Sequence, residues 1–323
     1  MRIAVVSDIH HASPAEQRRR GHESRAIRNR PLRLLVRAYR RFFWLADPLA
    51  HNHRLDDFLL RARDADHCVA NGDYSCDTAF VGVSDNAAYA SAQQVLDRLR
   101  AVFGTRLDLT YGDHELGKMS LFGGVGGLRR LSWSRCVHEL GMPPLWQRRF
   151  GRVVLAGVVS SLVALPVFAP ETLAEELPAW ERWRAEHLAA FRQFLEGLAP
   201  EDRLILFVHD PTALPFLWEE PALQSRRAQL EMTIIGHLHT PVIYRASRIL
   251  AGIPPIRFLG TSIRRMSEAL SRARLWKPFR VRLVPSLTGC QLLKDGGFGW
   301  LEVDPEGRRP SQLTIERLPW GKP

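Results

Sequence analysis

An aspartate and a histidine, separated by one residue, follow the first apolar run of the chain. Residues 3–6 predict a short buried strand, and Asp8 and His10 come directly after it. Residues two apart in an extended chain project to the same face, so these side chains should point to one place. A carboxylate oxygen and an imidazole nitrogen in one place form half of a metal site. Alone, the pair is equally consistent with an ordinary turn.

Four further apolar runs end in residues of the same kind. Ligands of open α/β sheets bind outside the carboxyl ends of the strands, so such side chains can converge from distant parts of a sequence. Each has an ordinary explanation alone, since Asn-Gly-Asp is a common turn and a lone histidine is usually a loop residue. Five such strand ends together are hard to attribute to turn chemistry. The additional residues are Asp73, Asp113, His209, His237 and His239.

The residue types of this set predict its chemistry. Seven aspartates and histidines are too many for one ion and suit two ions about 3.5–4 Å apart that share a carboxylate. Carboxylate oxygens with imidazole nitrogens favour Mn, Fe or Zn over Ca or Cu(I). Two such ions give a bridging hydroxide at neutral pH and neutralise an anionic substrate. The set therefore predicts hydrolysis of a phosphoester.

Strands must position these ligands, and helical patterns lie between the predicted strands. This alternation favours an α/β fold, and we expect a single domain over residues 1–323 that ends in a hairpin at 298–318. The expected strands after the first are at 67–70, 106–111, 152–159, 202–208, 232–235 and 256–261.

The chain is strongly basic, with a net charge of +11, and 41 of its 45 basic residues are arginine. Codon bias in a GC-rich genome explains such a composition, and so does attraction to phosphate-bearing partners. Two basic segments, 17–54 and 262–284, are expected as insertions, and residues 31–45 of the first predict a basic amphipathic helix. That helix could simply pack on the core, cover the active site, or rest on an anionic membrane surface.

Other sequence features bear on compartment and partners. Four cysteines without CxxC spacing suggest free thiols in a reducing compartment. Neither a secretory signal nor a membrane span is recognised, so we expect a cytoplasmic protein that could lie on the inner face of the membrane. We see no dedicated nucleic-acid-binding domain. The expected partner is a phosphorylated small molecule or a lipid-linked substrate.

The ligand motifs also occur in a characteristic order. Over residues 1–261 they resemble the pattern of the calcineurin-like metallophosphoesterase family, which is DxH, GDxx, GNH(D/E), H and GHxH. The resemblance implies a four-layer sandwich of two mixed β-sheets flanked by helices. The motifs here are Asp8-x-His10, Gly72-Asp73, Gly112-Asp113-His114-Glu115, His209 and Gly236-His237-x-His239.

The resemblance also implies roles for individual residues. Asp73 would bridge two divalent metal ions and take part in catalysis, and His114 would stabilise the transition state or protonate the leaving oxygen. The implied ligands are Asp8, His10, Asp73 and His239 for one ion, and Asp73, Asp113, His209 and His237 for the other.

One departure from the family pattern concerns the second ion. The usual asparagine is Asp113 here, and its extra negative charge should tighten metal binding while lessening attraction for a doubly charged monoester. The alternative is that Asp113 pairs with His114 or an arginine. Three further residues, Glu115, Asp77 and Asn71, are candidates for positioning the ligands.

The substrate is less well defined by the sequence. Phosphoprotein phosphatases of this superfamily carry GDYVDRG, whereas residues 72–77 here read GDYSCD and lack the phosphate-clamping arginine. Small or lipid-linked phosphoesters, monoester or diester, are therefore favoured over phosphoproteins, and a nucleotide- or lipid-linked phosphodiester is one expectation. The alternatives are a Ser/Thr phosphatase, or a catalytically weak or inactive metal-binding scaffold.

Overall fold

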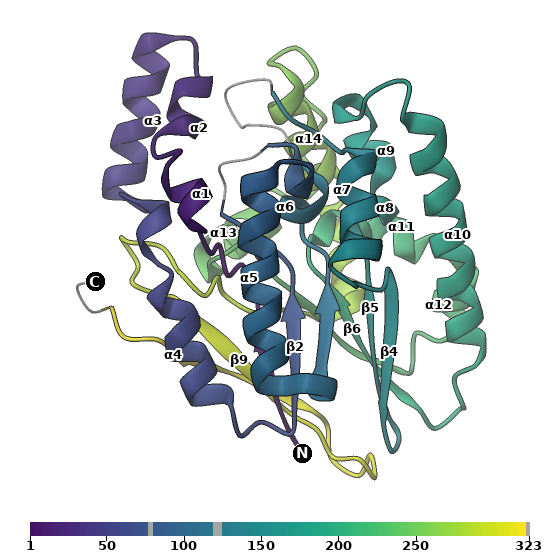
Figure 1. Cartoon of the computed structure of the whole chain (residues 1–323). Helices are drawn as coiled ribbons and strands as arrows, with labels where there is room; N and C mark the ends of the chain where they lie inside the picture. Colours follow the sequence, from purple (N-terminus) through teal and green to yellow (C-terminus); the bar gives the residue numbers. More distant parts are fainter. Residues whose placement is uncertain (77–79, 119–124, 321–323) are drawn as a thin grey trace.

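The computed structural model describes residues 1–76, 80–118 and 125–320 and contains two five-stranded sheets (Figure 1). The strand order is β10-β9-β1-β2-β3 in the first sheet and β4-β5-β6-β7-β8 in the second. The strands are β1 (Arg2–Val6), β2 (His67–Asn71), β3 (Leu107–Thr110), β4 (Leu145–Phe150), β5 (Val153–Val158), β6 (Arg203–Val208), β7 (Leu230–Ile235), β8 (Val281–Leu283), β9 (Gly297–Glu302) and β10 (Gln312–Arg317).

Both sheets are mixed, with their parallel strands next to one another. In the first sheet β1, β2 and β3 are parallel, while β9 pairs antiparallel with both β1 and β10. In the second, β5 to β8 are parallel and only β4 is antiparallel. Parallel strands covered on both faces need continuous apolar sequence, which is why they were readable as apolar runs.

The alternation of side chains along β1 shows how the sheets are layered. Ile3 and Val5 belong to the central core, which also contains Leu155 and Ile205 of the second sheet. Their neighbours Ala4 and Val6 belong to the outer core, together with helical residues. Neighbouring residues of a strand point to opposite faces, so one face of the sheet meets the other sheet and one meets helices. The expected sandwich of two mixed sheets flanked by helices is confirmed.

The helices lie outside the sheets and beyond the carboxyl ends of their strands (Figure 1). Their bounds are α1 (Pro14–Gln17), α2 (His22–Ala26), α3 (Arg30–Phe42), α4 (His53–Ala62), α5 (Asn86–Phe103), α6 (Asp113–Leu116), α7 (Arg130–Ser134), α8 (Ser160–Val163), α9 (Leu165–Phe168), α10 (Leu177–Glu196), α11 (Leu214–Trp218), α12 (Pro221–Ser225), α13 (Pro241–Ile249) and α14 (Thr261–Ser271).

The prediction of a strand at 256–261 is wrong. The segment has no regular structure before α14 begins at Thr261, and Phe258 is 84 % exposed. The amide of Ile256 donates to the Ser267 side chain, 2.8 Å away, and not to a neighbouring strand. Two prolines directly before the segment remove amide donors that a ladder would need.

Two strands were not expected from the sequence, β4 and β8. β4 is an edge strand in which exposed and less exposed residues alternate. Because Arg148 and Arg149 are adjacent in it, its sequence does not have the apolar pattern of a strand. β8 has only three residues inside the second basic segment.

The segment that contains α2 and α3 projects past the carboxyl ends of the strands of the first sheet (Figure 1). Proline stands in the first turn of α3, and the Asn29 side chain accepts a hydrogen bond from the Leu32 amide, which caps the helix. Among the described residues, no helix combines the length and the apolar character needed to cross a bilayer.

Candidate metal centre

The seven predicted ligands all lie at the carboxyl ends of parallel strands. In the first sheet, β1 leads to Asp8 and His10, β2 to Asp73 and β3 to Asp113. In the second, β6 leads to His209, and β7 leads to His237 and His239. Because the two sheets pack face to face, these side chains lie in one region at the ends of the strands.

Five of these residues have a left-handed backbone conformation. Their φ angles are 52° for Asp8, 50° for His10, 59° for Asp73, 56° for His237 and 57° for His239. Among the described residues only two other non-glycine residues have positive φ. This conformation costs free energy for residues other than glycine and persists where the surroundings enforce it, often at functional sites.

Backbone hydrogen bonds between the loops enforce these conformations. The Asp8 amide donates to the Gly72 carbonyl over 3.0 Å, and the His10 amide donates to the Asp73 carbonyl over 3.1 Å. Close packing adds to this, because a Cβ at Gly112 would lie 2.0 Å from Asp73 Oδ1. Glycine before the ligand at 113 is therefore required by space.

The first candidate group consists of Asp8, His10, Asp73 and His239, whose potential ligand atoms all lie within 4.8 Å of one another. His239 Nε2 is 2.9 Å from Asp8 Oδ1, and His10 Nε2 is 3.4 Å from His239 Nε2. Two imidazole nitrogens directed at one another and at a carboxylate form an arrangement suited to a divalent cation.

The second group consists of Asp73, Asp113, His209 and His237. His209 Nε2 lies 3.2 Å from Asp73 Oδ2 and 3.5 Å from Asp113 Oδ1, and His237 Nδ1 lies 3.1 Å from Asp113 Oδ1. Among the described residues, Asp113 thus forms ion pairs with two histidines of this group and with no arginine. The two groups share Asp73, as the resemblance to the family implied.

Unsatisfied buried atoms test whether this region fits metal ions. Asp8 Oδ1, Asp73 Oδ2 and His209 Nε2 are buried and have no hydrogen-bond partner of good geometry among the described residues. His209 Nδ1 donates to the Asn71 carbonyl over 2.6 Å, which directs the Nε2 lone pair toward the carboxylates. Buried carboxylates of this kind are costly unless a cation accompanies them. The residues therefore fit two divalent ions.

The pKa values of the histidines also indicate that the buried carboxylates stabilise positive charge nearby. Burial opposes it, but Asp73 and Asp8 raise the pKa of His209 above its usual value. Against burial, Asp210 and Asp113 raise the pKa of His237 to about 9. In contrast, burial and the neighbouring His114 lower the pKa of His10 to about 3. The carboxylates thus favour a cation, either a proton or a metal ion, on the side of His209 and His237.

His114 lies between the ligands and is buried. Its Nδ1 donates to the Ser75 carbonyl over 3.1 Å, and its Nε2 lies 3.7 Å from Asp73 Oδ2. The Lys118 ammonium group contacts this Nε2. A cationic group and an imidazole are thus placed together beside the shared aspartate, where charge on a leaving oxygen could be neutralised.

The three candidates for positioning residues have different outcomes. The buried carboxylate of Glu115 accepts hydrogen bonds from the amides of Asp73, Tyr74 and Gly112 at 2.8–2.9 Å, which ties two ligand loops together. Burial and the charge of Asp73 raise the pKa of Glu115 to about 7. Asn71 acts through its backbone carbonyl on His209 and not through its side chain. Asp77 lies outside the described residues.

Two residues that contact ligands are not predicted from the sequence, Ser7 and Trp44. Ser7 Oγ donates to Asp8 Oδ2 over 2.5 Å, and the Trp44 ring stacks on His239 with centroids 4.9 Å apart. Ser7 adjoins a predicted ligand, so position alone could have suggested it. Nothing in the sequence links Trp44, in the first basic segment, with His239.

The sequence and the structure were compared with those of known proteins. The Calcineurin-like phosphoesterase family model matches residues 1–241. No curated protein matches. A crystal structure of phosphopantetheinyl hydrolase from Mycobacterium tuberculosis is similar at 17 % identity, over 74 % of this chain and 83 % of that chain, with a TM-score of 0.33. The family match covers most of the chain, and the chain belongs to the calcineurin-like phosphoesterase family.

Proposed function

We propose that the protein is a metal-dependent hydrolase that cleaves a phosphoester with two divalent ions, Mn, Fe or Zn. The observation that carries this proposal is the pair of ligand groups that share the buried Asp73. When bound, two such ions lower the pKa of a water molecule and neutralise charge on the phosphate. All seven ligand positions hold suitable side chains, which favours an enzyme over an inactive scaffold.

Residues of the chain would position the ligands and stabilise the leaving oxygen. Asp8 is held by Ser7 and by the His237 amide, which donates to Asp8 Oδ2 over 3.1 Å. His114, oriented by the Ser75 carbonyl, would stabilise or protonate the leaving oxygen with Lys118 beside it. Asp113 would hold its ion more tightly than the asparagine usual in the family.

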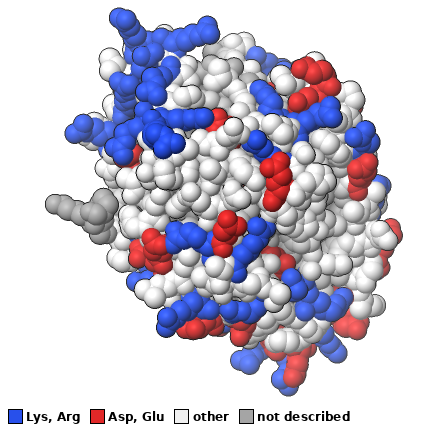
Figure 2. Space-filling view, in the orientation of Figure 1, with Lys and Arg blue, Asp and Glu red and all other residues white. Residues whose placement is uncertain are grey.

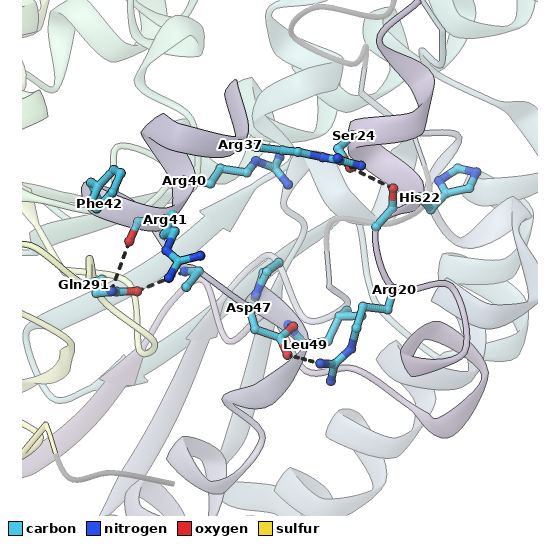
Figure 3. A pocket seen from close by; sticks show the side chains of 13 residues that line it. Arg20, His22, Ser24, Arg37, Arg40, Arg41, Phe42, Asp47, Leu49 and Gln291 are labelled. Atoms are coloured by element: carbon cyan, nitrogen blue, oxygen red, sulfur yellow. Dashed lines mark hydrogen bonds and ion pairs between the residues drawn. The ribbon is translucent and has the colours of Figure 1, made fainter. Parts of the chain in front are cut away.

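A cavity lined mainly by the first basic segment supports a small or lipid-linked phosphoester as substrate. Its volume is about 700 Å³, and Arg37, Arg40 and Arg41 of α3 are among its lining residues (Figure 3). Gln291 also lines it, and its amide donates to the carbonyl of Trp44, the residue that stacks on His239. Gln291 and Trp44 thus connect the cavity to the ligand His239 through two contacts, and several guanidinium groups can bind a second anionic group.

The test combines metal dependence with a matched pair of variants. The purified protein is stripped with a chelator, reloaded with Mn²⁺, Fe²⁺ or Zn²⁺, and assayed with bis(p-nitrophenyl) phosphate. Asp73→Asn should lose activity by at least about 100-fold, more than is usual for a residue outside the ligand set. Asp64→Asn, at a side chain that is 89 % exposed, should match the wild type. Equal activity of both variants, or activity without metal, would sink the proposal.

A further inference from the structure

The apolar side of α3 points into solvent. Leu34, Leu35, Tyr39, Phe42 and Phe43, in the helix and directly after it, are each 50–66 % exposed. Residues four apart lie on the same side of a helix. Positions 35, 39 and 43 form one such row and positions 34, 38 and 42 form the row beside it, so these side chains make one continuous stripe. Surface helices normally bury such a stripe against the core, and α3 buries only Val36. The first basic segment therefore does not simply pack its apolar face on the core.

The same segment is unusually rich in positive charge. Residues 25–46 contain seven arginines and no acidic residue. Arg33 donates to the Ile27 carbonyl and Arg37 to the Ser24 hydroxyl, which are neutral groups and leave the arginine charges uncompensated by those contacts. Figure 2 shows the blue side chains gathered over α2 and α3 at the upper left, with little red among them.

A second group of exposed apolar residues lies at the end of α13 and before α14. Ile249, the last residue of α13, is 83 % exposed, and Phe258 and Leu259, between α13 and α14, are 84 % and 55 % exposed. Figure 1 shows α14 and α3 both beyond the carboxyl ends of the strands.

We propose that α3 docks this protein on an anionic lipid bilayer, with its apolar stripe inserted among the lipids and its arginines on the headgroup phosphates. An exposed apolar stripe flanked by cations, with aromatic residues at one end, is the pattern of helices that lie in a membrane interface. Anionic lipid matches the charge of the segment, whereas a second copy of this chain would bring another set of arginines against it.

Docking of this kind would bring the metal centre close to the bilayer. Trp44 follows α3 by two residues and stacks on His239, so the inserted helix and the ligand are almost adjacent. If the proposed phosphoesterase function holds, its substrate would be drawn from the lipid surface. The docking itself needs no metal and is tested separately from catalysis.

The experiment is flotation of the full chain with vesicles, in chelator. One set of vesicles contains phosphatidylcholine alone, and the other contains equal parts of phosphatidylcholine and phosphatidylglycerol. We expect flotation with the anionic vesicles at low salt, reduced at high salt by screening, and little with the neutral ones.

Two variants form a matched pair, Leu35→Glu and Leu60→Glu. Both leucines are 66 % exposed and lie on helices, but Leu60 is on α4, away from α3 (Figure 1). Leu35→Glu should lower the bound fraction about tenfold, because it puts a charge in the inserted stripe. Leu60→Glu should bind as the wild type does, and circular dichroism should show both variants folded.

Three outcomes would overturn the proposal. One is the absence of flotation with anionic vesicles at low salt. Another is an equal loss of binding in the two variants. The third is a dimer in lipid-free solution, seen by light scattering, that Leu35→Glu dissociates, since the stripe would then be covered by a second copy of this chain.

Discussion

The metal centre and the α3 segment use charge in opposite ways. In the centre, carboxylates and imidazoles are mostly buried, and loop hydrogen bonds hold five of them in left-handed conformations. In α3, arginines lie around an exposed apolar stripe. The first arrangement fixes geometry, which metal-assisted chemistry needs. The second offers a surface that can meet a partner. In the proposed function, the reaction would depend on the first region and the choice of substrate on the second, as is common when loops and insertions are carried by a rigid scaffold.

Loss of a ligand should have the largest effect. His209→Ala removes a buried imidazole that faces both Asp73 and Asp113, so kcat/KM for bis(p-nitrophenyl) phosphate should fall at least about 100-fold. His138→Ala, on the exposed side of its helix, is the control and should leave the rate unchanged. Full activity of His209→Ala would show that the second ligand group is not used.

Rigidity of the centre can be tested with two glycines. Gly72 has φ of +92°, and a Cβ there would lie 2.6 Å from the Gly112 nitrogen. Gly72→Ala should therefore lower the free energy of unfolding by about 2–4 kcal/mol. Gly104 also has positive φ, but a Cβ there would have no other atom within 4 Å. Gly104→Ala should therefore lower the free energy of unfolding by only about 1 kcal/mol. Chemical denaturation of both measures the difference, and equal losses would contradict the close packing.

Asp113→Asn restores the residue usual in the family. The amide oxygen can still face His237 and His209, but one negative charge is lost. We expect the metal ion that binds more weakly to have a dissociation constant about tenfold higher in this variant, measured by titration calorimetry. Unchanged or tighter metal binding would mean that Asp113 does not hold an ion.

The smallest effect is expected where the two regions touch. Trp44→Ala removes the ring that stacks on His239, while the ligand set stays complete. We expect a change of a few-fold in KM and little change in kcat, because ring stacking contributes about 0.5–1.5 kcal/mol. A loss as large as that of His209→Ala would mean that the first basic segment belongs to the reaction itself.

The sequence predicted the buried parts of the molecule well. Parallel strands covered on both faces are continuous apolar runs, so their ends could be located, and the ligands follow those ends. Edge elements were missed because exposure makes their sequence polar, as in β4, or because they are very short, as in β8. The segment at 256–261 was wrongly predicted as a strand because its apolar residues, which are largely exposed in the structure, resemble a buried apolar run.

Contacts between distant segments were beyond the sequence. The stacking of Trp44 on His239 depends on how the segment after α3 lies against the loop that follows β7, and no local pattern encodes it. The amphipathic pattern of α3 was visible, but the side that faces solvent was not, because periodicity does not tell which face is buried. The resemblance to the family implied which ligands hold which ion, and in the structure each of these two sets of side chains lies together.

The most direct test of the account is to locate the metal ions. Crystals of the Mn²⁺-loaded protein, measured at a wavelength where manganese scatters anomalously, should show two peaks about 3.5–4 Å apart. Asp73 should lie between them, with Asp8, His10 and His239 around one and Asp113, His209 and His237 around the other. A single peak, or two peaks that do not share Asp73, would contradict the dinuclear centre.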